Sequence, residues 1–162
     1  MSDKAVVYFS VYETTKAVAE EIARQTGADL IEIVPEVPYD GNRDHYDDLA
    51  AYAKREHDEN MRPAIVNGID LVAYSTVFVG YPMWWYTMPM IMYTFFEGVD
   101  LSGKTVVPFN THMGSRDGGT YRTIRELCPE SEVLDGLPIE MRAAEAGPTA
   151  LVRDWLSRLG FE

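Results

Sequence analysis

Cysteine and positive charge are both scarce in this 162-residue chain. Its one cysteine, Cys128, can form neither an intrachain disulfide nor a cysteine-ligated zinc site, which points to a reducing, cytoplasmic setting. The chain has 14 Lys and Arg residues but 26 Asp and Glu residues, so the formal net charge is −12. An acidic surface of this kind repels phosphate backbones, and we expect no nucleic-acid partner.

Signals for secretion, membrane insertion and metal binding are missing too. No basic segment followed by an apolar run and a cleavage pattern opens the chain. The uncharged stretch 71–96 is long enough to span a bilayer, but Gly80, Pro82 and Pro89 interrupt it, so a buried strand, a loop and a buried helix are expected instead. The three histidines are far apart in sequence, and we expect no metal. The G-x-S-x-G and G-x-G-x-x-G motifs are both absent.

Hydrophobic residues make up 46% of the chain, enough to build one buried core, and the length fits one domain over residues 1–162. Short apolar runs alternate with amphipathic segments from end to end. Strands are predicted at 5–9, 30–34, 72–80, 104–109 and 133–139, the last as an edge strand because Gly136 and Pro138 interrupt it. Helices are predicted at 14–25, 45–60, 88–96, about 121–128 and 151–159. Tyr46, Leu49, Ala50 and Ala53 are expected to form the apolar face of the second helix.

This alternation predicts an α/β fold with a five-stranded parallel sheet, strand order 2-1-3-4-5, and helices on both faces. Ligands of such folds bind beyond the carboxyl ends of the strands, near the point where the strand order reverses. The loops after the first, third and fourth strands follow neighbouring strands of this order. We therefore expect these three loops to meet at one crevice.

The first of these loops, residues 10–16, is rich in hydroxyl groups and comes just before a helix. Ser10, Tyr12, Glu13, Thr14 and Thr15 are its candidate ligand-binding residues. Hydroxyls and free backbone N–H groups at a helix N-terminus favour a phosphate. The alternative is that Thr14 and Thr15 only cap the helix, with Glu13 stabilised by the helix dipole.

The second loop carries two adjacent tryptophans, Trp84 and Trp85, directly after a predicted strand. Neighbours in sequence point in different directions, so at most one of them fits comfortably in the core. The other is available to stack on a planar ligand or a partner. The candidate residues of this loop are Pro82, Met83, Trp84, Trp85 and Tyr86.

The third loop, residues 109–119, combines glycines with short polar side chains and can hydrogen-bond the edge of a heteroaromatic ring. A flexible surface loop is the alternative, and His112 is expected to be a solvated loop histidine rather than a proton donor. The candidate residues are Asn110, Thr111, His112, Gly114 and Ser115.

The three loops together resemble those of the flavodoxin family, specifically its short-chain bacterial members. Tyr8-Phe9-Ser10 with Thr15-Lys16 resembles the family's phosphate loop. Gly80-Tyr81-Pro82-Met83-Trp84-Trp85 is similar to its G-Y-P-x-W-W flavin loop, and residues 109–115 are similar to its F-x-T-H-x-G-S loop. The resemblance covers nearly the whole chain. It implies a flavodoxin-like three-layer sandwich, noncovalently bound FMN and an electron-transfer function, with the candidate residues above as cofactor-binding residues.

Three positions depart from the family pattern. Tyr12 replaces a small hydroxyl residue of the phosphate loop, Glu13 replaces its glycine, and Tyr86 stands where relatives often have glycine. A carboxylate near a phosphate repels it. The alternative function is therefore a flavodoxin-like module with weakened or lost FMN binding that acts through protein contacts.

Acidic residues cluster around the second predicted helix. Their expected role is a solvated helix face, and the functional alternative is a docking face for a basic redox partner protein. The cluster comprises Asp44, Asp47, Asp48, Glu56, Asp58 and Glu59.

Overall fold

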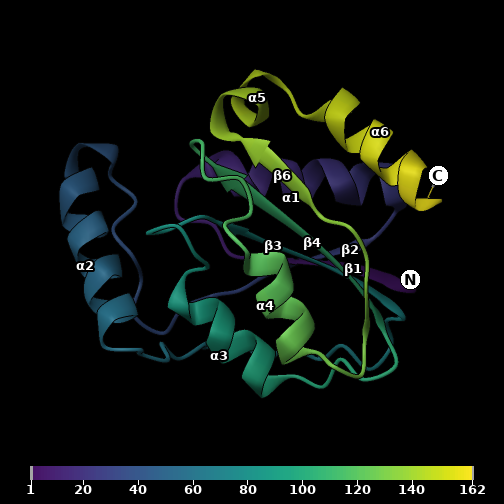
Figure 1. Ribbon diagram of the computed structural model, residues 1–162, viewed down its shortest axis with the longest axis horizontal. Coiled ribbons are helices and arrows are strands. Elements are labelled where there is room, and N and C mark those ends of the chain that lie inside the picture. Colours follow the sequence, from purple (N-terminus) through teal and green to yellow (C-terminus); the bar gives the residue numbers. More distant parts are fainter. Residues whose placement is uncertain (1, 162) are drawn as a thin grey trace.

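A parallel sheet lies at the centre of the computed structural model, which describes residues 2–161 (Figure 1). Its strands follow the order β2-β1-β3-β4-β5, and β6 pairs with β4 beyond β5. The expected flavodoxin-like α/β fold is confirmed. The strands are β1 (Lys4–Tyr8), β2 (Asp29–Glu32), β3 (Thr76–Pro82), β4 (Thr105–His112), β5 (Glu132–Val133) and β6 (Leu137–Glu140).

Helices cover both faces of this sheet, with α1, α5 and α6 on one face and α3 and α4 on the other (Figure 1). Within β1, Val6 packs into the core under the first group and Val7 into the core under the second, because successive side chains of a strand point to opposite faces. The helices are α1 (Glu13–Thr26), the 3₁₀ turn η1 (Arg43–His45), α2 (Tyr46–Asp58), α3 (Met90–Gly98), α4 (Thr120–Leu127), α5 (Met141–Ala146) and α6 (Thr149–Leu159).

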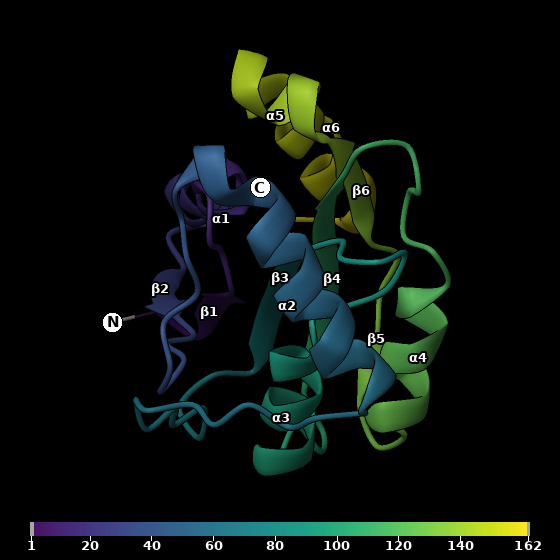
Figure 2. The same cartoon turned by 90° about the vertical axis from the view of Figure 1, so that its left-hand side faces the viewer.

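Helix α2 does not join either layer. It lies beyond one end of the strands, and in the view onto that side it crosses in front of β3 and β4 (Figure 2). Its predicted apolar face is only partly correct, because Leu49 and Ala53 are buried whereas Tyr46 is 52% exposed. Helix α2 is thus positioned to form a wall at the carboxyl edge of the sheet.

Strand β3 begins at Thr76, so the prediction of a strand from residue 72 was wrong at its start. The side chain of Val72 is 86% exposed, and its backbone N–H donates to the carboxylate of Asp70 at 3.0 Å. This turn interrupts the uncharged stretch before the strand. Among residues 2–161, no helix is long and apolar enough to cross a membrane.

The predicted strand 133–139 is divided into β5 and β6. Gly136 lies between them, where an added Cβ would come within 2.5 Å of the Tyr121 ring. The close approach of this ring leaves no room for a side chain. The short helix α5, which directly follows β6, is not predicted by the sequence pattern.

Candidate functional site

A cavity of about 750 Å³ opens at the carboxyl edge of the sheet, between the three predicted loops and α2. This volume lies within the range of small-molecule sites. Every predicted site residue lines it except Glu13 and Asn110. The further lining residues are Val11, Tyr46, Asp47, Leu49, Ala50, Ala53, Met113 and Met141, five of them from α2.

The N-terminus of α1 forms one end of the cavity. Tyr12 is the N-cap residue and makes no side-chain capping hydrogen bond, so the interpretation of Thr14 and Thr15 as caps is not supported. The first N–H groups of an α-helix have no partner within the helix, and they carry its positive dipole end. The Ser10 hydroxyl reaches into this turn and accepts from the backbone N–H of Lys16 at 3.3 Å.

Four further hydroxyls lie at this end of the cavity. The Thr15 and Thr111 hydroxyls share a buried hydrogen bond at 2.7 Å, which ties the first loop to the third. The hydroxyls of Tyr12 and Thr14 are buried and have no hydrogen-bond partner within the described residues. Buried polar groups are normally hydrogen-bonded. Unpartnered hydroxyls beside a helix N-terminus fit a site built for a ligand with several acceptor oxygens.

Glu13 points away from this end of the cavity. Its side chain is 84% exposed, and its carboxylate lies 3.7 Å from the ammonium of Lys16 one turn later. The guanidinium of Arg43 lies 4.7 Å from the centre of the Tyr12 ring. Lys16 therefore offsets the carboxylate that the sequence places in this loop, and Arg43 adds a second cation beside Tyr12.

The tryptophan loop is a tight hairpin. Trp84 and Thr87 exchange both backbone hydrogen bonds, at 2.9 and 3.2 Å, which leaves Trp85 and Tyr86 as the two turn residues. Their φ angles are +53° and +64°. Left-handed backbone at bulky residues costs roughly 1–2 kcal/mol each and is concentrated at functional sites.

The two tryptophans have different surroundings. Trp84 is partly buried and packs edge-to-face against Phe9 and Tyr39, with ring centres 5.4 and 5.2 Å away. Trp85 is 42% exposed, and its indole N–H donates to the backbone carbonyl of Ala50 at 2.8 Å. Trp84 thus belongs to the wall of the cavity, whereas Trp85 connects the hairpin to α2.

His112 is buried at the end of β4, so the expectation of a solvated loop histidine was wrong. Its Nδ1 accepts from the backbone N–H of Gly114 at 3.0 Å. Burial also lowers the pKa of this imidazole. A neutral ring with its proton on Nε2 is the form that satisfies this hydrogen bond, so His112 shapes the third loop.

Asn110 supports the same loop from beneath. Its side chain is fully buried, accepts a hydrogen bond from the Tyr121 hydroxyl and donates one to the Arg116 carbonyl at 2.8 Å. The second loop joins the third where Met83 donates its backbone N–H to the Thr111 carbonyl at 2.9 Å. Asn110 therefore holds the loop in place without reaching the cavity.

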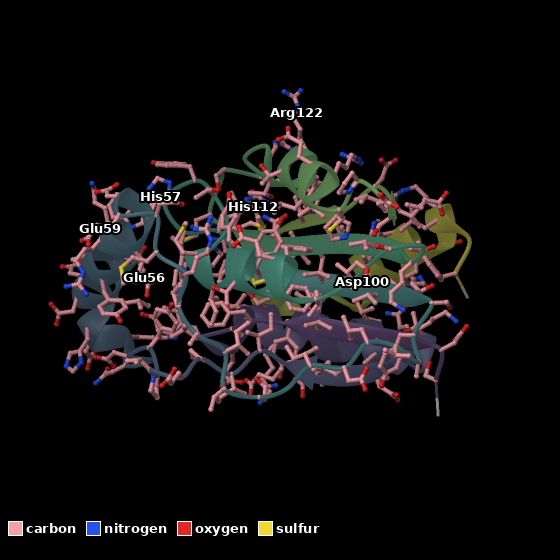
Figure 3. All side chains as sticks on the ribbon, turned by 90° about the horizontal axis from the view of Figure 1, so that it is seen from below. Glu56, His57, Glu59, Asp100, His112 and Arg122 are labelled. Atoms are coloured by element: carbon pink, nitrogen blue, oxygen red, sulfur yellow. The ribbon has the colours of Figure 1, made fainter. Side chains whose placement is uncertain are left out.

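The acidic face of α2 includes one buried member, which corrects the prediction for Glu56. This side chain is 2% exposed and accepts a hydrogen bond from the Tyr39 hydroxyl, whereas Glu59 is exposed (Figure 3). Burial raises the pKa of the Glu56 carboxyl. No pattern in the sequence predicts this pair, because Tyr39 lies in a segment with turn-forming composition.

A model of the flavodoxin family matches residues 3–158. The chain belongs to this family. It is 32% identical to a proposed flavoprotein from Bacteroides eggerthii, with 98% of each chain covered and a TM-score of 0.80. An FMN complex of a Lactobacillus acidophilus flavoprotein is 19% identical, covers 91% of this chain and 97% of its own, and has a TM-score of 0.64. An FMN-bound flavodoxin from Fusobacterium nucleatum is 12% identical, with 98% of each chain covered and a TM-score of 0.59. No curated protein gave a significant match.

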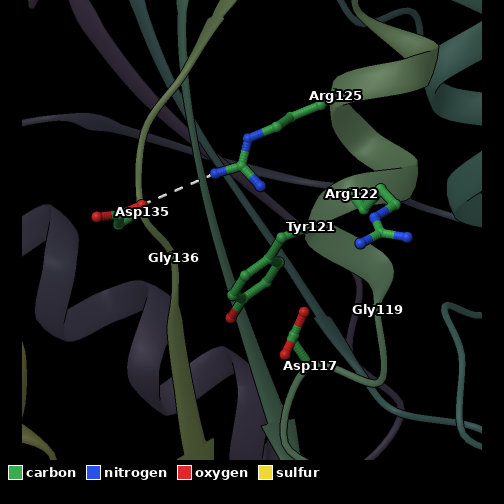
Figure 4. A pocket seen from close by; sticks show the side chains of 7 residues that line it. All are labelled: Asp117, Gly119, Tyr121, Arg122, Arg125, Asp135 and Gly136. Atoms are coloured by element: carbon green, nitrogen blue, oxygen red, sulfur yellow. Dashed lines mark ion pairs between the residues drawn. The ribbon is translucent and has the colours of Figure 1, made fainter.

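A second hollow of about 570 Å³ lies beside α4 of this flavodoxin-family chain, between that helix and the segment joining β5 to β6 (Figure 4). Arg122 and Arg125 line it together with Asp117 and Asp135, and Arg125 lies 3.8 Å from Asp135. Two carboxylates thus offset two guanidiniums. Within residues 2–161, moreover, no group of three His, Cys, Asp or Glu side chains is arranged to hold a metal ion.

Proposed function

We propose that the protein binds FMN without a covalent bond and acts as an electron carrier. The observation that carries this proposal is the single cavity joining the uncapped N-terminus of α1, the Trp84 wall and the third loop. FMN has a phosphate at one end and a planar ring at the other, and the two ends of the cavity suit these two chemistries. The family and the FMN complexes of its structural neighbours support the choice of ligand.

The roles of the chain's residues follow from their positions. Backbone N–H groups of Glu13 to Thr15 and the hydroxyls of Ser10 and Thr14 would hold the phosphate. Trp84 would stack on the ring, and backbone groups of residues 111–115 would bond its edge. Bound FMN supplies the capacity to accept and donate electrons, and the protein sets its affinity and reduction potential.

The start of α2 supports the proposal of a basic redox partner. Asp44, Asp47 and Asp48 are exposed next to the cavity, and none of them makes an ion pair within residues 2–161. Asp58 and Glu59, at the other end of α2, are paired with Lys54 and Arg55. Electron transfer to a basic acceptor protein should therefore slow as salt rises. We place this activity in the cytoplasm, on the basis of the single, buried cysteine.

Titration of FMN against the purified protein tests cofactor binding. Stacking on Trp84 should quench the flavin fluorescence with one site per chain. Absence of quenching at micromolar protein and tens of micromolar FMN would contradict the carrier function.

That outcome would favour the second candidate function, a module that acts through protein contacts. Tyr12 and Glu13 support this second function, because they replace the small residues of the family's phosphate loop. The exposed turn residue Tyr86, 77% accessible beside the cavity, would then belong to a protein-binding surface.

A further inference from the structure

The buried carboxyl of Glu56 has an unusual environment. Its two oxygens lie 2.9 and 3.0 Å from the hydroxyl of Tyr39, which has only one proton to donate. No other side-chain or backbone donor bonds this carboxyl within the described residues. Burying a carboxyl with a single partner costs stability relative to an apolar residue. The presence of Glu56 at this position is therefore not explained by packing.

Tyr39 carries this contact toward the cavity. Its ring packs edge-to-face against Phe9 at 5.4 Å and Trp84 at 5.2 Å, and Phe9 packs against Trp84 at 5.4 Å. The three rings form a closed triangle drawn from three loops. Edge-to-face packing has a defined angular preference, so the direction of each ring depends on the other two.

Within residues 2–161, only the Tyr39 corner of this triangle has a polar anchor. The hydroxyl bond to Glu56 constrains the direction of the Tyr39 ring, which also packs edge-to-face against Tyr52 of α2 at 5.7 Å. The hairpin fixes the backbone of Trp84 but not the rotation of its indole. Trp84 lines the cavity, whereas Glu56 and Tyr39 do not.

We propose that Glu56 is a positioning residue that acts through Tyr39 to fix the orientation of the Trp84 indole in the wall of the ligand cavity. The inference rests on the proposed function only in naming a flavin ring as the group that the oriented indole meets.

Three variants of the full chain separate the hydrogen bond from the packing. Tyr39→Phe removes only the hydroxyl, and Glu56→Leu removes the acceptor. Glu56→Gln keeps an acceptor oxygen for the Tyr39 hydroxyl. The chain also offers a matched control, Tyr74→Phe, because the Tyr74 hydroxyl donates to the Asp29 carboxylate at 2.8 Å and neither residue lines the cavity.

The primary readout needs no ligand. Protein labelled with 5-fluorotryptophan gives one ¹⁹F resonance for each of Trp84, Trp85 and Trp155, assigned by replacing each in turn. The Trp84 resonance should shift or broaden in Tyr39→Phe and Glu56→Leu and stay near its original position in Glu56→Gln. The Trp155 resonance, from the opposite core, should not move. An unmoved Trp84 resonance in Tyr39→Phe, or an equal shift in Tyr74→Phe, would overturn the proposal.

Flavin titrations form the second arm. Tyr39→Phe should weaken FMN and riboflavin alike, by about two- to fivefold, because the affected wall faces the ring and not the phosphate. A loss confined to FMN would overturn the proposal. If the wild-type protein binds neither flavin, the proposed function fails, and the ¹⁹F result alone decides on Glu56. If Glu56→Leu does not fold, Tyr39→Phe decides, because it keeps the ring and removes a single oxygen.

Discussion

Replacing Gly118 with alanine should damage the cavity, although Gly118 does not itself line it. Gly118 has a φ of +55°, and an added Cβ would lie 2.6 Å from the backbone carbonyl oxygen of Tyr86 and 2.6 Å from the Met83 methyl. The Met83 side chain can rotate away, but the Tyr86 carbonyl belongs to the strained hairpin. The third loop and the hairpin must therefore move apart.

The cost has two parts. Left-handed backbone at alanine costs roughly 1–2 kcal/mol, and the clash with a backbone atom adds roughly 1–3 kcal/mol. Gly119→Ala is the matched control, because Gly119 has a φ of +82° but nothing within 4 Å of its added Cβ. Only the first cost applies there. Gly118→Ala should thus lose about 2–5 kcal/mol of unfolding free energy and Gly119→Ala only about 1–2 kcal/mol.

Urea denaturation of both variants measures the difference in unfolding free energy. The urea concentration at the midpoint should fall, while the slope of unfolding free energy against urea concentration stays constant. FMN titration then reports on the cavity. Gly118→Ala should bind FMN about tenfold more weakly than the wild type, which corresponds to a loss of about 1.4 kcal/mol in binding free energy. Equal losses in the two variants would refute the reasoning, because the hairpin and the third loop would then not be in contact at Gly118.

Three smaller changes test other parts of the site. Glu13→Gln should raise the affinity for FMN only about twofold and leave the affinity for riboflavin unchanged, because the exposed carboxylate is already paired with Lys16 and screened by solvent. A gain of tenfold or more in an FMN titration would mean that Glu13 faces the phosphate. Trp85→Phe removes the hydrogen bond to Ala50 and should lower the unfolding free energy by about 1 kcal/mol. Amide hydrogen exchange along α2 should also become faster. Unchanged exchange would show that this hydrogen bond does not hold α2 in place. For Glu56, burial raises the folded-state pKa above the unfolded one, so the wild type loses stability as pH rises through the folded-state value. Glu56→Gln cannot ionise, so its melting temperature should rise relative to the wild type as the pH increases above the usual range of a glutamate carboxyl, and a constant difference would contradict a buried titrating carboxyl.

The fold and the meeting of the three loops were predictable because their signals are local. Continuous apolar runs mark β1 and β3, which are covered on both faces, and strand order then places the loops together. The start of β3 was misplaced because Leu71 is buried while Val72, equally apolar, lies in an exposed turn. Hydrophobicity alone does not distinguish these two neighbours.

The contribution of α2 to the site could not be predicted in the same way. Its place beyond the strand ends depends on contacts with Trp85 and Tyr39, which are distant in sequence. Glu56 looks like any other acidic residue of a charged helix, and only its pairing with Tyr39 explains its burial. Long-range pairs of this kind leave no periodic pattern in the sequence.

The hairpin at residues 84–87 also affects which substitutions evolution can accept in this sequence. Two-residue turns of its shape are most stable with Asn-Gly, yet this chain places Trp85 and Tyr86 there, both with positive φ. Substitution toward Asn-Gly would relieve the backbone and remove both aromatic side chains from the mouth of the cavity. Selection for thermal stability should therefore favour Asn-Gly at these two positions, whereas selection for ligand binding at the cavity should favour the aromatic residues.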